Sequence, residues 1–346
     1  MLTPGMGPAD RWDHLVPRDA RHVHLITRGN VDGIVSSAIF FSKFPDARVS
    51  YVPSATAAVE VLRKDLSARV FYVIDIGLTP QLTRTLNLKA KTGQRVVLID
   101  HHQQSAMHAH ELGAHVEVVV EEAGSAASVA LRHMSSPGAH LDADLEHLER
   151  LAAVADLVEY GVSPYYFESL SRYGADRLEE EAVHLDFSWR LEVEDDRFRA
   201  MTGRRLARGA WPSEVPEVRR RYLTMVNENR WLKAKDRVRS RLVIRNGVGL
   251  LNFGKRKPSL LGFGTRALTS VAKEEGASVA VLVNRRRDMA SLALRRVGES
   301  ELNLGLFVER FTAVHGVVGG GHPASAGAKI LARDFPLFMQ EVYALA

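Results

Sequence analysis

The chain has 346 residues, of which 46% are hydrophobic and 25% charged, a composition typical of a soluble globular protein of two or three domains. It contains no cysteine, which excludes disulfides, zinc fingers and thiol catalysis and fits a reducing cytoplasm, the location we expect. No apolar run approaches the roughly 18 residues of a membrane span, and a formal charge of +5 makes the protein mildly basic.

Short buried strands and helical patterns alternate between residues 21 and 120. We expect strands at 23–27, 48–52, 70–74, 95–99 and 115–119, with helices near 33–44, 55–64, 79–91 and 105–112. Because strands that alternate with helices are joined by crossovers, the fold class is α/β, with a mostly parallel sheet flanked by helices. Residues 124–190 are mostly helical in pattern.

Residues 191–240 are expected to form a helical linker with a polar helix near 217–239, after which the strand pattern restarts. Asn246-Gly247 between two apolar runs predicts a hairpin over 242–251. A helix near 260–275, strands near 278–284 and 289–297, a helix near 303–313 and a glycine-rich loop at 319–321 follow.

This pattern predicts four segments. They are a flexible N-terminal extension (1–20), a first α/β domain (21–190), the helical linker (191–240) and a smaller C-terminal α/β domain (241–346). We expect an active-site cleft between the two α/β domains.

Acidic and imidazole side chains follow three of the expected strands. Asp32 comes after the first strand, Asp75 after the third, and Asp100-His101-His102 ends the fourth. Because the C-terminal ends of parallel strands share one edge of the sheet, where ligands bind, we expect these groups to converge. A further acid, Asp156, interrupts an apolar helical stretch at 143–160.

Each acid alone has an ordinary structural explanation. In isolation, Asp32 is explained as a turn or a helix cap, Asp75 as a cap of the helix after it, and Asp156 as the partner of an arginine. The three groups at 100–102 are harder to explain this way, since a buried strand gains nothing from them. Converging carboxylates are costly to bury unpaired, so we expect a divalent cation: Mn²⁺ suits mixed Asp/His ligands, with Mg²⁺, Co²⁺ or Zn²⁺ as alternatives.

The order and spacing of Asp32-Gly33, Asp75, Asp100-His101-His102 and Asp156 resemble those of the DHH phosphoesterases. Downstream, Gly319-Gly320-Gly321-His322 resembles the Gly-Gly-Gly-His motif of the DHH-associated C-terminal domain. The resemblance covers residues from about 20 to 332. That family includes RecJ-type exonucleases, nanoRNases and oligoribonucleases, pAp phosphatases and cyclic-dinucleotide phosphodiesterases.

The resemblance implies metal ligands. Asp75 would bridge two ions, and the other ligands completing the shell of one ion would be Asp32, His101 and Asp156. The first motif departs from the family pattern, because Asn30 stands where an acid is usual and Arg28 where many members have one. The shell of a second ion is therefore depleted.

Three interpretations of this departure stay open. The one we favour is a single tightly held ion with a second, weak ion recruited by substrate. Alternatively, Asn30 with His24 or His22 holds the second ion, or the site is catalytically weak. We further hypothesise that Arg28 contacts a substrate phosphate in place of the missing ion.

The resemblance also implies catalytic and substrate-binding roles. Asp100 would hold the histidines in position, and His102 would face the phosphate. The positions that would grip the nucleotide are Arg295, Gly319, Gly320, Gly321 and His322.

We expect a metal-dependent phosphodiesterase of the exonuclease or nanoRNase type, which uses metal-activated water to hydrolyse short single-stranded RNA or DNA to nucleoside monophosphates. The alternatives are a pAp phosphatase, a phosphodiesterase of linear or cyclic dinucleotides and, in another class, a nucleic-acid-binding protein with a degenerate site. Clustered Lys and Arg between Arg197 and Arg256 would attract such a polyanion. No membrane partner is expected, and a homodimer is left open.

Overall fold

The computed structural model describes residues 22–135, 146–159, 161–253, 260, 262–298 and 301–345. The chain divides into two compact units, residues 1–222 and 223–346. The expected extension at 1–20 and the basic cluster at 255–257 lie outside the described residues. The four segment boundaries and the cleft stay predictions. Within the described ranges, no helix is both long and apolar enough to cross a membrane.

The N-terminal unit contains a five-stranded sheet of order β2-β1-β3-β4-β5, in which neighbouring strands pair in parallel. Its strands are β1 Val23–Arg28, β2 Arg48–Val52, β3 Val70–Ile74, β4 Arg95–Asp100 and β5 Val116–Val120. The predicted parallel sheet is therefore confirmed, and each strand begins and ends within one residue of its expected bounds.

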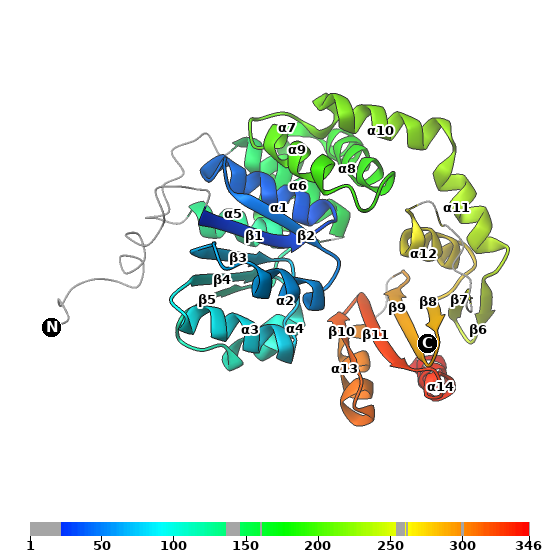
Figure 1. Cartoon of the computed structure of the whole chain (residues 1–346). Coiled ribbons are helices and arrows are strands. Elements are labelled where there is room, and N and C mark those ends of the chain that lie inside the picture. The colour runs from blue at the N-terminus through cyan, green and yellow to red at the C-terminus, as the bar shows by residue number, and fades with distance from the viewer. Residues whose placement is uncertain are drawn as a thin grey trace. The chain divides into compact units, whose positions relative to one another are not determined.

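Helices cover both faces of this sheet. Those between the strands are α1 Val31–Lys43, α2 Ala55–Lys64, α3 Pro80–Lys91 and α4 Gln103–His108, with a 3₁₀ turn η3 at Ala109–Glu111. Those after the sheet are α5 Ala126–Ser135, α6 Glu146–Glu159, α7 Pro164–Tyr173, α8 Ala175–Arg190 and α9 Asp196–Leu206, with a 3₁₀ turn η4 at Pro212–Glu214. Figure 1 shows α2 and α3 on one face, and α1, α5 and α6 on the other.

The strands read as continuous apolar runs because both faces of the sheet are buried. Successive side chains of β1 point to opposite faces, so Leu25 joins the core that contains Phe40 of α1, whereas Ile26 joins the core that contains Leu82 of α3. With both cores apolar, polar side chains gather beyond the strand ends. This places the chemistry at one edge of the sheet.

The expected polar helix near 217–239 is two helices, α10 Pro216–Asn227 and α11 Arg230–Arg239, so the prediction of one helix is wrong. Asn229, between them, adopts a left-handed backbone conformation with φ of +51°, which interrupts the helical hydrogen-bond ladder. The preceding helix α9 is also more than a connection, since Phe198 and Leu206 belong to the same core as α1.

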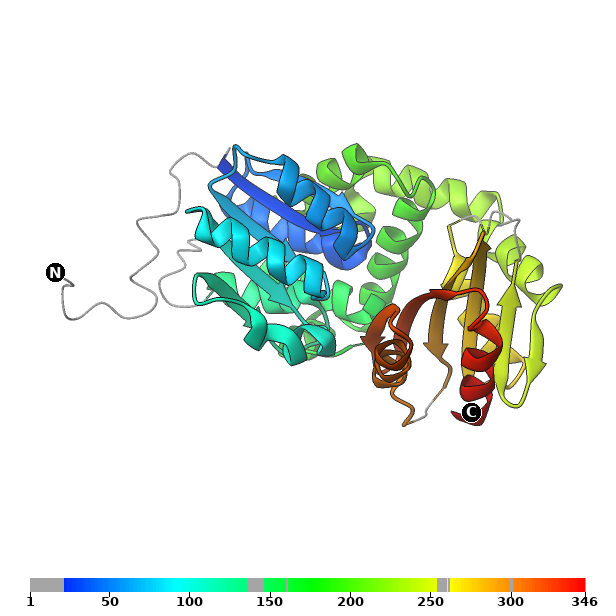
Figure 2. The same ribbon diagram turned by 60° about the horizontal axis from the view of Figure 1, so that its bottom comes forward.

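The C-terminal unit contains a six-stranded mixed sheet of order β10-β11-β9-β8-β7-β6. Its strands are β6 Val243–Arg245, β7 Val248–Asn252, β8 Val279–Arg286, β9 Met289–Arg296, β10 Val318–His322 and β11 Ser325–Leu331, and its helices are α12 Gly264–Glu274, α13 Leu304–His315 and α14 Phe335–Leu345. Figure 2 shows α13 and α14 together against this sheet, where they share one apolar core with β8, β9 and β11. The predicted hairpin is confirmed, with positive φ angles at Asn246 and Gly247 between β6 and β7.

The glycine-rich segment is a strand, so the prediction of a loop at 319–321 is wrong. Gly319, Gly320 and Gly321 lie in β10, at the edge of the sheet, paired with β11. Gly320 and Gly321 have φ angles of +155° and +153°, which side chains disfavour, and a β-carbon on Gly321 would overlap the carbonyl oxygen of Ser325. Glycine is therefore required for this strand to approach β11.

Candidate metal centre

The candidate site lies where the crossovers of the first sheet change direction. From β1 the chain enters α1 on one face of the sheet, and from the neighbouring β3 it enters α3 on the other. Ligands of open α/β sheets bind at such a point, beyond the strand ends. Asp32 follows β1, Asp75 follows β3 and Asp100 ends β4, so the topology brings together three of the predicted acids.

Asp75 is the centre of this cluster. Its Oδ1 lies 3.7 Å from Nε2 of His101 and 4.0 Å from Nδ1 of His102. Its Oδ2 is buried and has no hydrogen-bond partner, and its backbone is left-handed, with φ of +58°. A buried carboxylate oxygen without a donor is costly, and a cation is the usual compensating partner.

Asp100 orients both histidines. It is fully buried, and its Oδ1 accepts hydrogen bonds from the backbone N–H of His101 (2.9 Å) and from Nδ1 of His102 (2.6 Å). Its Oδ2 accepts from the hydroxyl of Ser105. Burial alone would raise the pKa of Asp100, but the charge and hydrogen bond of His102 outweigh it and hold that pKa well below its usual range. Asp100 is therefore a carboxylate that fixes the ring of His102.

His101 is turned toward two carboxylates. Its Nδ1 lies 3.4 Å from the carbonyl oxygen of Ala123, and its Nε2 lies 3.7 Å from both Oδ2 of Asp32 and Oδ1 of Asp75. Burial lowers the pKa of His101, but the interaction with Asp75 and the surrounding carboxylate charges raise it to about 10. Two ligands that share an ion at about 2.1 Å each lie at most about 4.2 Å apart, so these separations fit a shared cation.

Asp32 holds the start of α5 as well as facing His101. Its two carboxylate oxygens accept hydrogen bonds from the backbone N–H groups of Ala126 (2.8 Å) and Ala127 (2.7 Å). Asp32 therefore does cap a helix, as one of its ordinary explanations predicts. The helix that it caps is α5, which lies far along the sequence. Burial, followed by the charge of Asp75, raises the pKa of Asp32.

Asp156 is held by three serine hydroxyls, not by an arginine. Its Oδ1 accepts from Ser125 (2.6 Å) and Ser128 (2.7 Å), and its Oδ2 accepts from Ser163. A β-carbon on Gly124 would lie 2.5 Å from its Oδ1, so glycine leaves room for this carboxylate. Burial raises the pKa of Asp156. The sequence does not predict these three serines, because no pattern along the chain pairs them with Asp156.

Ligand atoms of four residues approach one another within 4.8 Å. Among the residues that the structure describes, this group consists of Asp75, Asp100, His101 and His102, without Asp32 and Asp156. Asp32 nevertheless touches the group through His101.

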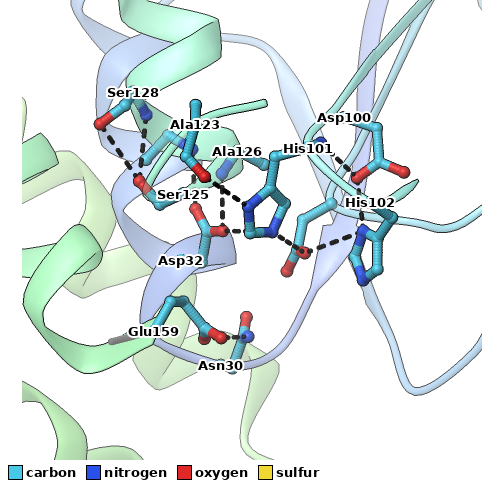
Figure 3. A network of polar contacts seen from close by, with 12 residues as sticks. Asn30, Asp32, Asp100, His101, His102, Ala123, Ser125, Ala126, Ser128 and Glu159 are labelled. Carbon is cyan, nitrogen blue, oxygen red and sulfur yellow. Dashed lines mark hydrogen bonds and ion pairs between the residues drawn. The ribbon is translucent and has the colours of Figure 1, made fainter. Parts of the chain in front are cut away.

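Asn30 is joined to an acid that the sequence analysis missed. Its Oδ1 caps α1 by accepting from Gly33 N–H (3.1 Å), and its Nδ2 donates to Oε1 of Glu159 (3.2 Å). Figure 3 shows the Asn30 and Glu159 side chains meeting beside Asp32. Glu159 ends α6 three residues after Asp156, a spacing that puts both acids on one side of the helix and was the available signal. The Glu159 side chain is exposed at the end of α6, where the charge of Asp75 acts on it.

His24 does not reach this site, so the interpretation that it helps to hold a second ion is wrong. Its Nδ1 lies 2.6 Å from Oδ2 of Asp65, and its Nε2 lies 2.8 Å from Oγ of Ser50. Both ring nitrogens are thus bonded, and the ring packs beside Phe71, away from the cluster.

No protein-family model matches this sequence, and no curated protein matches it. Three solved structures are similar over nearly the whole chain. A DHH domain described as a member of the s1p family of ribosomal proteins has a TM-score of 0.64 at 16% identity, with 94% of this chain and 87% of that chain covered. An exopolyphosphatase-related protein from Bacteroides fragilis has a TM-score of 0.55 at 13% identity and 99% coverage of both chains. A pGpG-specific phosphodiesterase, PggH from Vibrio cholerae, has a TM-score of 0.50 at 12% identity, with 93% and 98% covered.

The chain has the DHH fold. At these identities the likeness is one of architecture, and it agrees with the parallel sheet and the smaller second sheet. The Asp100-His101-His102 segment ends β4 of this DHH fold, where the sequence analysis expected it.

The predicted substrate-binding residues lie together within the C-terminal unit of the DHH fold. Arg295 on β9 is paired with Ser325 on β11, which in turn is paired with His322 on β10. The register therefore brings Arg295 and His322 to the same level of the sheet, with the predicted glycines, Gly319 to Gly321, beside them on β10.

Proposed function

We propose that this chain is a metal-dependent phosphodiesterase that hydrolyses short single-stranded oligonucleotides to nucleoside monophosphates. The observation that carries the proposal is the cluster in which Oδ1 of Asp75 faces His101 and His102, with ligand atoms within 4.8 Å of one another. Carboxylate oxygen and imidazole nitrogen suit Mn²⁺, with Mg²⁺ or Co²⁺ as alternatives, so the residues fit the ion that the DHH fold implies.

The ion would be held by Asp75 and His101, with Asp32 and Asp156 as further ligands. A carboxylate oxygen can accept a hydrogen bond and still bind a cation, so the backbone bonds of Asp32 and the serine bonds of Asp156 are compatible with ligation. When bound, the ion would lower the pKa of a water molecule and neutralise negative charge on the phosphate.

The residues around the ion would position the substrate. Asp100 holds His102 through Nδ1, and this bond sets the orientation in which the His102 ring would face a phosphate oxygen. His102 keeps 18% of its side chain exposed, more than His101 at 6%, so substrate reaches it more readily. We retain Arg28, at the end of β1, as a further phosphate contact.

The substrate class is supported by charge and by fold. Helix α11 carries five Lys and Arg side chains, namely Arg230, Lys233, Lys235, Arg237 and Arg239, with one acid, Asp236. Glu228 and Glu274 pair with Arg230, Lys235 and Arg239, and the remaining excess of positive charge attracts a polyanionic strand. Arg295 and the glycines of β10 would bind the nucleotide in the C-terminal unit.

A second candidate is a phosphodiesterase of linear dinucleotides. It is favoured by the likeness to a pGpG-specific phosphodiesterase, which covers 98% of that chain. Both candidates break a phosphodiester bond, so they differ only in the substrate length that the site accepts.

The test is hydrolysis of end-labelled oligonucleotides of graded length, including a dinucleotide, with Mn²⁺, Mg²⁺ and Co²⁺ in turn. Asp75→Ala is compared with Asp46→Asn, an exposed acid away from the cluster. We expect a ladder ending in mononucleotides, lost in Asp75→Ala and kept in Asp46→Asn. Cleavage of the dinucleotide alone would select the second candidate. Binding without turnover for every metal would make the chain a nucleic-acid-binding protein instead.

A further inference from the structure

Glu159 supplies a carboxylate next to the position where the first motif lacks one. The acid usual at position 30 in the family that the chain resembles is replaced by Asn30, which removes one carboxylate from the first motif. Glu159 comes from the end of α6, 129 residues away in sequence, and its Oε1 accepts a hydrogen bond from Nδ2 of Asn30 at 3.2 Å. The fold therefore places the carboxylate of Glu159 beside Asn30, the position at which the first motif lacks an acid.

Asn30 is placed to position Glu159, and its neutral amide oxygen is a weaker cation ligand than a carboxylate. Its oxygen accepts from Gly33 N–H as the cap of α1, and this bond turns the amide nitrogen toward Glu159. An amide nitrogen donates hydrogen bonds and does not bind cations. The carboxylate of Glu159 is therefore the anionic group at this place.

Asp75 provides the second, independent observation. Its side chain is about 95% buried, and its Oδ2 has no hydrogen-bond partner, while Oδ1 faces the two histidines. The histidine-facing oxygen belongs with one ion. The second oxygen of the same carboxylate, buried and unsatisfied, is the atom at which a further cation would bind.

We propose that Glu159 is a ligand of a second divalent cation, which it shares with Asp75, and that Asn30 holds Glu159 in place. The inference rests on the proposed function in that it uses the same metal centre. Glu159 and Asp75 lie close enough for their charges to interact. Carboxylates gathered in this way repel one another, and a divalent ion between them removes the cost.

The experiment counts bound ions directly. The protein is stripped with a chelator and titrated with Mn²⁺, and the bound ions are counted by equilibrium dialysis and by electron paramagnetic resonance, which detects coupling between two nearby Mn²⁺ ions. We expect two ions in the wild type. Glu159→Gln should weaken the second ion at least about tenfold while keeping the first. Glu179→Gln, an exposed acid on α8, is the matched control and should keep both ions.

A double variant moves the acid back to the motif. In Asn30→Asp with Glu159→Gln the hydrogen bond is reversed in polarity and the net charge is unchanged, so the second ion should return. Two ions in Glu159→Gln, or one ion in the wild type, would each refute the proposal. A melting curve without metal shows that each variant is folded.

This outcome is separable from that of the proposed function. Two coupled ions, one lost in Glu159→Gln, would support the role of Glu159 even if no oligonucleotide were hydrolysed. Conversely, hydrolysis with unchanged ion counts in Glu159→Gln would keep the function and reject the ligand.

Discussion

Nε of Arg199 donates a hydrogen bond to the carbonyl oxygen of Gly29, at 2.9 Å. The same guanidinium donates to Oδ1 of Asp196 (2.5 Å) and to the carbonyl oxygen of Val193. A β-carbon on Gly29 would lie 2.8 Å from the guanidinium carbon, so a side chain at this position would displace the Arg199 guanidinium. Helix α9 thus holds, from outside the sheet, the loop between β1 and α1, which follows Arg28 and contains Asn30.

Replacing Arg199 should loosen that loop. Arg199→Ala leaves two backbone carbonyl groups without their donor, so we expect a loss of about 1–3 kcal/mol in the free energy of unfolding. If Arg28 and Asn30 act on substrate or metal, the variant should also raise KM or weaken Mn²⁺ binding. Arg205→Ala, an exposed arginine on the same helix, is the control. Equal stability of the two variants in urea unfolding would contradict the idea that Arg199 holds this loop.

Gly33→Ala should be strongly destabilising. Gly33 is buried in the first turn of α1, and an added β-carbon would overlap the carbonyl oxygen of Arg28, which is backbone and cannot rotate away. We expect a loss of about 3 kcal/mol or more, because either α1 or β1 has to shift. Gly264→Ala, at the start of α12, meets nothing within 4 Å and should leave the melting temperature nearly unchanged. Thermal melts of both variants decide the matter.

Asp100→Asn should impair the site while leaving the chain folded. The amide keeps the shape of the carboxylate but removes the charge that holds His102 and His101. We expect activity to fall about 10- to 100-fold, as for other residues that orient metal ligands. Ser105→Ala removes only a donor to Oδ2 and should have the smaller effect. A larger loss in Ser105→Ala would show that charge on Asp100 is unimportant.

Acid should weaken the fold through His24. Burial is the largest influence and lowers the pKa of His24 below 6.5, although Asp65 partly offsets it. The folded protein therefore favours the neutral ring, while the unfolded chain binds a proton near pH 6.5. This contribution to stability is complete above pH 6.5 and is lost as the pH falls from there toward the lowered pKa.

The measurement is the urea midpoint from roughly pH 8 to pH 5. His24→Gln should be less stable at neutral pH, because it loses a bond to Asp65 or Ser50, yet its midpoint should change less with pH. His110→Gln, an exposed histidine, should follow the wild type. A His24→Gln midpoint with the wild-type slope would exclude His24 as the sensor.

Sheet topology and the strand-end residues were predictable because they depend on local patterns. Apolar runs located β1, β3 and β4, and parallel pairing then required Asp75 and Asp100 to lie at one edge. The Asn246-Gly247 hairpin was predictable for the same reason, since the turn needs two positive φ angles.

What escaped prediction depends on pairs distant in sequence. Glu159 reads as an ordinary last residue of a helix, and only the tertiary fold places it against Asn30. The sequence predicts that the stretch containing Arg199 is a linker. Apolar residues near Arg199 pack in the same core as α1, but no pattern along the chain reveals this contact. Because glycine favours turns, the sequence predicts a loop at 319–321, but the segment is a strand in which the close contact of Gly321 with β11 requires glycine.

The left-handed backbone of Asp75 lowers the stability of the folded protein, while its side chain supplies a carboxylate to the candidate metal centre. Such a conformation costs an aspartate about 1 kcal/mol or more, whereas glycine adopts it freely. Asp75→Gly should therefore unfold at a higher temperature than Asp75→Ala, and in the absence of metal it should match or exceed the wild type. If folding stability alone determined the residue at position 75, glycine would be favoured. The aspartate at this position is therefore explained by what its carboxylate does and not by its effect on stability.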